Sequence, residues 1–139
     1  MDKAVIDTDI FSEIRKKIAQ QVVERANIYR QNFGHYTISV ITVLEVTKGW
    51  RKRQREDRIQ EFIRDISDVE VLSIDVQIAE LAGRIEADLE RTGQPIGLAD
   101  ALIAATAIQY KLVLITENLS HYQRIKALDY SLRLDNWRA

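Results

Sequence analysis

The chain has no cysteine, one proline and only five glycines among its 139 residues. Without cysteine there is no thiol catalysis, no cysteine-ligated zinc or iron–sulfur site and no disulfide, which suits a reducing compartment. No apolar run approaches the roughly 18 residues of a membrane-spanning helix. The first residues reach Asp7 before a long apolar stretch forms, which argues against a secretory signal. We therefore expect a cytoplasmic protein without membrane contact.

The sparse glycines also form no phosphate-binding loop and no Gly-x-Ser-x-Gly nucleophile motif. Hydrophobic residues make up 46% of the chain and charged residues 29%, as in a globular domain that buries most of its apolar surface. No repeat, low-complexity tract or linker divides the chain. We expect a single domain over residues 1–139.

Short apolar segments alternate with segments of helical period, which is typical of an α/β domain with a parallel sheet. We predict a three-layer sandwich in which a mostly parallel, about five-stranded sheet is flanked by helices. Helical packing is indicated by Ile14, Ile18 and Val22, and Gly93 is a plausible end of the helix over 78–89. The expected strands are 3–6, 36–41, 69–74, 112–115 and 131–134, and the other expected helices are 59–66 and a buried 98–110.

Three carboxylates stand against apolar sequence. Asp7 ends the first predicted strand, Glu45 follows the second, and Asp100 lies near the start of the helix predicted to be buried. Ligand sites in open α/β sheets form outside the carboxyl ends of the strands, and a buried carboxylate needs a partner. The alternatives are structural: Asp9 or Asp7 as a helix cap, Glu45 on an outer helix face, and Asp100 favoured by the helix dipole.

Polar residues also follow the strand over 112–115, where Thr116, Glu117 and Asn118 come in succession. If the strands are parallel, these residues join the three acids around one pocket. Such a cluster needs a divalent cation, and all-oxygen ligands select Mg²⁺ or Mn²⁺. The simplest chemistry is attack of a metal-activated water on a phosphoryl centre. His35 and His121 have no metal-binding spacing, and we expect ordinary surface or hydrogen-bonded histidines.

Three segments in order resemble the PIN-domain ribonucleases, and most closely the VapC-type toxins of toxin–antitoxin pairs. They are Val5–Phe11 (Val-Ile-Asp-Thr-Asp-Ile-Phe), Ser39–Glu45 (Ser-Val-Ile-Thr-Val-Leu-Glu) and Ala99–Ala107 (Ala-Asp-Ala-Leu-Ile-Ala-Ala-Thr-Ala). The segment Leu132–Trp137 is similar to the same branch. The resemblance therefore runs from Val5 to Trp137.

The resemblance implies a Mg²⁺- or Mn²⁺-dependent endoribonuclease with a cognate antitoxin and a homodimeric state. By this analogy Asp7 and Asp100 are the metal ligands, and Glu45 completes the acidic pocket and orients or deprotonates the attacking water. Thr116 and Asn118 would orient the water or the phosphate. Asn118 stands where the family often has a fourth acid, which leaves open a second metal and a role for Glu117.

A basic segment begins just after Glu45, with six basic and two acidic residues between Lys48 and Arg58 in a chain of net charge −1. Lys48, Arg51 and Arg53 are candidates for holding an RNA backbone, and Trp50 could stack on an unpaired base. The alternative is a solvated helix end with Trp50 packed inward or in a dimer contact.

Two other functions remain open. Asp7-Thr-Asp9 after a strand is also typical of aspartyl-phosphate phosphotransferases, and receiver-like proteins gather acids such as Asp75 at strand ends. These proteins have a lysine at the end of a late strand, which Leu112–Thr116 lacks. Asn118 alone would suit a non-catalytic PIN-like binding module.

Overall fold

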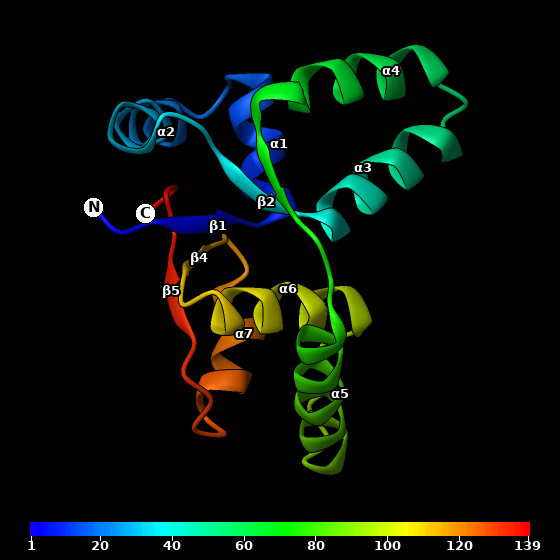
Figure 1. The fold of residues 1–139 in the computed structure, drawn as a ribbon, viewed down its shortest axis with the longest axis vertical. Helices are drawn as coiled ribbons and strands as arrows, with labels where there is room; N and C mark the ends of the chain where they lie inside the picture. The colour runs from blue at the N-terminus through cyan, green and yellow to red at the C-terminus, as the bar shows by residue number, and fades with distance from the viewer.

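The computed structural model describes residues 1–139 and contains five short strands, seven α-helices and one 3₁₀ turn (Figure 1). The strands are β1 (Ala4–Ile6), β2 (Thr37–Ser39), β3 (Glu70–Leu72), β4 (Val113–Ile115) and β5 (Arg133–Asp135). The helices are α1 (Thr8–Lys16), α2 (Gln20–Phe33), α3 (Val40–Lys52), α4 (Glu56–Asp65), α5 (Val76–Arg91), α6 (Leu98–Gln109) and α7 (Leu119–Lys126), and the 3₁₀ turn is η1 (Ile66–Asp68).

All strand pairs are parallel, but they form two hydrogen-bonded sheets. One sheet has the order β1-β4-β5 and the other pairs β2 with β3. β1 and β2 lie next to each other without forming a ladder. The predicted α/β architecture is confirmed, with the five strands divided between two sheets rather than joined in one.

The parallel register brings the carboxyl ends of β1 and β4 to one edge of the larger sheet. Ile6 pairs with Ile115, so Asp7 and Thr116 are the next residues along two adjacent strands. The backbone N–H of Asp7 donates to the carbonyl of Ile115 over 2.8 Å, which extends the pairing to the point where the chain turns into α1. This edge positions the candidate site.

The helices predicted from apolar periodicity are present in α4, α5 and α6. Gly93 follows the end of α5 with φ of 73°, as expected of a helix-terminating glycine. The helical packing predicted through Ile18 is wrong. The first helix ends at Lys16, Lys17 takes a left-handed conformation with φ of 57°, and Ile18 is exposed between α1 and α2.

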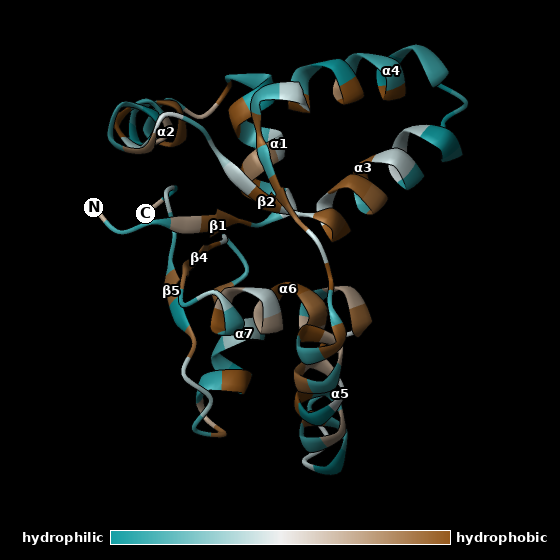
Figure 2. Cartoon of the chain, viewed as in Figure 1, coloured by the Kyte–Doolittle hydropathy of each residue, from teal (hydrophilic) through white to brown (hydrophobic).

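Two apolar clusters lie on the two sides of the larger sheet. One contains α5, α6 and α7, where the small side chains of α6 are buried and let this helix pack closely against α5. The other contains α1 and α2 with Tyr29, Phe62 and Trp137. Figure 2 shows hydrophobic residues along β1 and α6 and hydrophilic residues at the far ends of α3 and α4.

The pair α3 and α4 extends away from the sheet as an arm (Figure 1). α3 begins directly after β2, so its first turns lie against the body and its last turns lie in the arm. None of the seven helices combines the length and the apolar character that spanning a bilayer requires.

Candidate active site

The carboxylates of Asp7 and Asp100 are brought together by one side chain, Tyr122. The Tyr122 hydroxyl lies 3.1 Å from Asp7 Oδ2 and 3.1 Å from Asp100 Oδ1. Asp7 is at the end of β1 and caps α1, Asp100 is in the first turn of α6, and Tyr122 is on the buried face of α7. Three segments distant in the sequence therefore meet at the predicted edge.

Thr116 binds the first of these acids. Its hydroxyl donates to Asp7 Oδ2 over 2.9 Å and lies 3.4 Å from Asp9 Oδ2. Asp9 Oδ2 also accepts the backbone N–H of Glu117 over 3.1 Å. Of the two acids offered as a helix cap, Asp7 caps α1, while Asp9 holds the turn between β4 and α7 through its Oδ2.

Glu45 is linked to the pair through Thr8 rather than directly. The Thr8 hydroxyl donates to Glu45 Oε1 over 2.6 Å and lies 2.9 Å from the hydroxyl of Thr42. The backbone N–H of Thr8 donates to Asp7 Oδ1 over 2.9 Å. Glu45 therefore lies on the same side of the molecule as Asp7 and is connected to it through Thr8.

The site has an excess of negative charge. Burial raises the pKa of Asp7 to about 7, with the charges of Asp9 and, to a smaller extent, Asp100 acting in the same direction. Burial also raises the pKa of Asp9, and burial together with the two carboxylates raises the pKa of Tyr122. Asp100 pairs with His121. Asp7, Asp9 and Asp100 therefore lack the lysine or arginine partners that buried carboxylates usually have.

The donor set fits a divalent cation. The hard carboxylate oxygens of Asp7 and Asp100 converge. Both acids retain oxygen lone pairs, because Asp7 Oδ1 and each oxygen of Asp100 have a single hydrogen-bond partner. No three acidic or histidine side chains approach closely enough to form a metal site by themselves. Asp7 and Asp100 are the residues that would hold the ion, while Glu45 is held by Thr8.

His121 and Tyr122 are the site residues that the sequence analysis missed. His121 Nδ1 lies 3.2 Å from Asp100 Oδ2, so this histidine is one of the two expected kinds, a hydrogen-bonded one, and its partner is an acid of the site. Both follow β4 by only a few residues, and this closeness to Thr116 is the signal that could have found them. Asn118 begins α7 without capping it by its side chain, and its N–H donates to the Thr116 hydroxyl over 3.0 Å.

Glu117 forms an ion pair with Arg138. Arg138 Nε lies 2.8 Å from Glu117 Oε2, and its terminal nitrogen lies 2.8 Å from Glu13 Oε1. The second oxygen of Glu13 is buried without a partner. One arginine therefore connects the turn after β4 with α1.

The basic segment lies in the arm, from the distal end of α3 through the turn to the start of α4. Lys48 is one helical turn beyond Glu45 and is exposed. The guanidinium groups of Arg53 and Arg58 lie 4.9 and 5.7 Å from the centre of the Trp50 ring, and Arg51 lies 4.0 Å from Glu56. Of the arginines predicted to bind RNA, Arg53 therefore also covers the tryptophan, whereas Arg51 pairs with Glu56.

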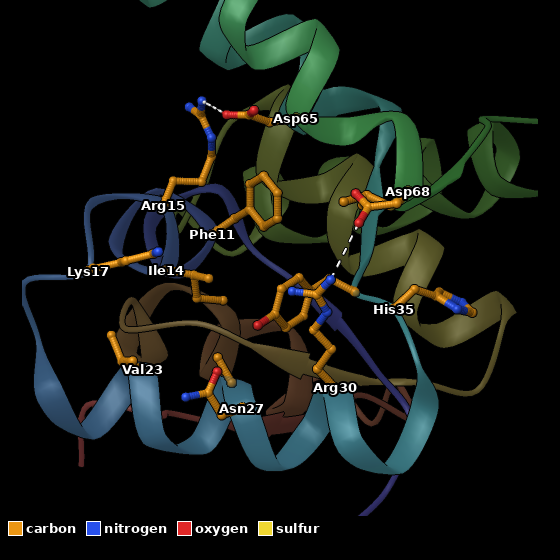
Figure 3. A pocket seen from close by; sticks show the side chains of 13 residues that line it. Phe11, Ile14, Arg15, Lys17, Val23, Asn27, Arg30, His35, Asp65 and Asp68 are labelled. Atoms are coloured by element: carbon orange, nitrogen blue, oxygen red, sulfur yellow. Dashed lines mark hydrogen bonds and ion pairs between the residues drawn. The ribbon is translucent and has the colours of Figure 1, made fainter.

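A separate pocket of about 480 Å³ lies between α1, α2 and the end of α4 (Figure 3). Two ion pairs cross its walls, Arg15 with Asp65 at 2.7 Å and Arg30 with Asp68 at 3.5 Å. None of the sequence-predicted site residues lines it. The acidic edge and this pocket are distinct features of the molecule.

Comparison with known proteins gives consistent results. The family model of the PIN domain matches residues 4–127. The chain is 33% identical to the tRNA(fMet)-specific endonuclease VapC of Shigella flexneri over 138 residues, which is 99% of both chains. It is also 33% identical, with the same coverage, to ribonuclease VapC2 of Haemophilus influenzae.

Two solved structures have similar folds. DNA-bound VapBC from Salmonella typhimurium matches with a TM-score of 0.80 and 34% identity over 99% of each chain. VapBC2 from Rickettsia felis, bound to a promoter DNA fragment, matches with a TM-score of 0.80 and 25% identity over 96% of this chain and 98% of that chain.

Proposed function

The chain belongs to the PIN-domain family and is a VapC-type endoribonuclease, the toxin of a toxin–antitoxin pair, and we propose that Asp7, Glu45 and Asp100 cleave its RNA. The observation that carries these roles is the convergence of Asp7 and Asp100 on the Tyr122 hydroxyl. The proposed reaction is hydrolysis of a phosphodiester by water at the carboxyl edge of the larger sheet. Residues 1–139 form one domain in this proposal.

Each site residue has a role that its contacts support. Asp7 and Asp100 would hold Mg²⁺ or Mn²⁺, which when bound supplies positive charge to the phosphate and lowers the pKa of water. Glu45 orients the attacking water or accepts its proton, because its carboxylate is held in place by Thr8. Thr116 fixes Asp7 through its hydroxyl, and Asn118 offers an amide at the same turn for the water or the phosphate.

The substrate in this proposal is RNA bound along the arm. Lys48, Arg51 and Arg53 extend from the helix of Glu45 and would contact phosphates, with Trp50 beside them. Because a relative identical at 33% of positions is a tRNA(fMet)-specific endonuclease, we propose tRNA as the first substrate to test. The proposed place of action is the cytoplasm.

The partner of such a toxin is a cognate antitoxin, in keeping with the antitoxin-bound state of the similar VapBC structures. We also propose a homodimer. The aspartyl-phosphate alternative receives no support, since β4 is followed by Thr116 rather than lysine and the relatives are ribonucleases. The binding-module alternative depends on Asn118 alone and predicts no cleavage with any metal.

The proposal is tested by incubating the purified chain with initiator tRNA and total RNA in Mg²⁺ or Mn²⁺. We expect discrete cleavage, products with 5′-phosphate and 3′-hydroxyl ends because water is the nucleophile, and complete loss of cleavage in EDTA. Asp7→Asn and Asp100→Asn should each reduce the rate by at least about 100-fold, since each removes a charge that the reaction uses.

Asp129→Asn is the matched control. Asp129 is exposed and has φ of 66°, a conformation that asparagine adopts readily, so this variant removes one carboxylate without disturbing the fold. It should cleave at the wild-type rate. Full activity of Asp7→Asn or Asp100→Asn, or cleavage that persists in EDTA, would contradict the assigned roles.

A further inference from the structure

Tyr122 is the only side chain that contacts both acids of the proposed metal pair. Asp7 Oδ2 also accepts from Thr116 and Asp7 Oδ1 from the Thr8 N–H, while Asp100 Oδ2 contacts His121. None of those other donors reaches across from one acid to the other. The Tyr122 hydroxyl is therefore the one side-chain group that links the two carboxylates.

The ring that carries this hydroxyl is fixed. Tyr122 is fully buried in the apolar cluster of α5, α6 and α7, and Ile125 on the same face of α7 is fully buried as well. A buried aromatic side chain has two rotatable side-chain bonds, and close packing holds it in one conformation. The hydroxyl is thus a fixed point between β1 and α6, not a mobile group at the surface.

The hydroxyl has one proton and two carboxylate neighbours. It donates to only one of Asp7 and Asp100 at a time, and the other oxygen remains close because both acids are anchored to the same point. The bridge leaves at least one lone pair unused on each oxygen of Asp100 and on Asp7 Oδ1. These are the oxygens available to a cation.

We propose that Tyr122 is a positioning residue that holds the carboxylates of Asp7 and Asp100 at the separation a shared divalent cation requires. This inference rests on the proposed function, because it assigns a role to Tyr122 within that site. Tyr122 does not itself react with RNA or water. Removing its hydroxyl should weaken cation binding while the ring continues to fill the core.

The test compares Tyr122→Phe with Tyr130→Phe. Tyr130 donates to Asp88 Oδ2 over 2.6 Å, so the control also removes one phenol–carboxylate hydrogen bond, but outside the site. Binding of Mn²⁺ is measured by isothermal titration calorimetry, and the shift in Tm on adding Mn²⁺ is measured in parallel. We expect the Kd for Mn²⁺ to rise about 5- to 10-fold in Tyr122→Phe, the effect of one lost hydrogen bond, and to stay unchanged in Tyr130→Phe.

RNA cleavage provides a second readout. Tyr122→Phe should need more Mn²⁺ for half-maximal rate, with a smaller change in the rate at saturating Mn²⁺. A purely structural role would instead lower the Tm equally with and without Mn²⁺ and leave the Kd unchanged, which would overturn the inference. Tighter Mn²⁺ binding would overturn it too, since it would mean that the hydroxyl competes with the cation.

Failure of this inference differs from failure of the proposed function. If the wild-type chain cleaves RNA and Tyr122→Phe binds Mn²⁺ as the wild type does, only the role of Tyr122 is wrong. If the wild-type chain neither binds Mn²⁺ nor cleaves RNA, the proposed site and the role of Tyr122 both fail.

Discussion

The side chain of Asp7 is almost fully buried although it has no basic partner, and these two properties rarely occur together in a carboxylate. It is 6% exposed, and its oxygens are bound by the Thr8 N–H and by the hydroxyls of Thr116 and Tyr122. Neutral donors stabilise a carboxylate less than a cation does, so burial dominates and the pKa rises to about 7. Near neutral pH, the metal-free site exists in both protonation states of Asp7.

This pKa predicts that the metal-free protein loses stability as the pH rises. Between the ordinary value of 3.8 and about 7, the folded chain binds a proton at Asp7 that the unfolded chain has released. The free energy of unfolding therefore falls across this interval and levels off above it. From the protonation of Asp7 alone, we expect a decrease of about 2–3 kcal/mol between pH 5 and pH 8.

The measurement is urea unfolding in EDTA at both pH values, with Asp7→Asn as the comparison. The variant keeps both histidines and every other titrating group, so the difference between the two proteins isolates Asp7. The free energy of unfolding of Asp7→Asn should not show the part of the decrease that comes from Asp7. An identical pH dependence in wild type and variant would show that Asp7 has an ordinary pKa.

At the scale of elements, the arm formed by α3 and α4 has a different charge from the sheet edge. Glu45 lies near the body, and the basic residues follow in the next turns of the same helix. A polyanion aligned along α3 would therefore meet positive charge in the arm and acids at the edge of the sheet. This arrangement favours binding of the RNA backbone at a distance from the phosphate that reacts.

The arm should give RNA binding a measurable salt dependence. Lys48→Gln and Arg51→Gln should each raise the Kd for RNA and lower the slope of log K against log salt by about one, as expected for one lost phosphate contact. Binding is measured in EDTA so that the RNA stays intact. Lys111→Gln is the control, because Lys111 precedes β4 at the opposite edge of the sheet. Equal slopes for all four proteins would exclude the arm as the RNA-binding surface.

The elements were easier to predict from the sequence than the contacts between them. Asp7, Asp100 and Thr116 were identified because strand ends and a buried helix place them, and those signals are local. The division of the strands into two sheets was not predictable, since strands of three residues leave no pattern that distinguishes neighbours with a ladder from neighbours without one.

Tyr122 and His121 were missed for a similar reason. In the sequence, Tyr122 and Ile125 form an ordinary apolar face of a short helix, and His121 has no metal-binding spacing. Their contacts with Asp100 exist only because α7, which packs against α5 and β5, brings its first turn to the start of α6, and this is a tertiary arrangement. Ile18 shows the opposite error, because its apolar side chain fits a helical period but the left-handed Lys17 ends the helix before it.

For the whole molecule, four of the nine exposed large apolar side chains lie in the first two turns of α3, α5 and α6. Val40 and Leu44 lie one turn apart on α3, Val76 begins α5 and Leu98 begins α6, and α6 contacts both α3 and α5. Such side chains would be covered in the proposed homodimer.

The native mass of the purified chain should therefore be twice its 16.1 kDa. Leu44→Arg should shift the chain to the monomer, because a charge would replace an apolar side chain that is 58% exposed in the isolated chain. Ile63→Arg, at an exposed apolar position on α4, should leave the mass unchanged. A monomeric wild-type chain at micromolar concentration would contradict the proposed dimer, and a dimeric Leu44→Arg would place its interface elsewhere.

The two ion pairs of Arg138 have a consequence for the order of events during translation. The turn that carries Thr116 and Asn118 is fastened by β5, which pairs with β4, and by Arg138, which holds Glu117 and Glu13. β5 and Arg138 are synthesised after the turn itself and after Asp7, Glu45 and Asp100. On the ribosome, the acids of this RNA-cutting protein are therefore made before the residues that hold the Thr116 turn, and residues 133–138 are the last of these to be added.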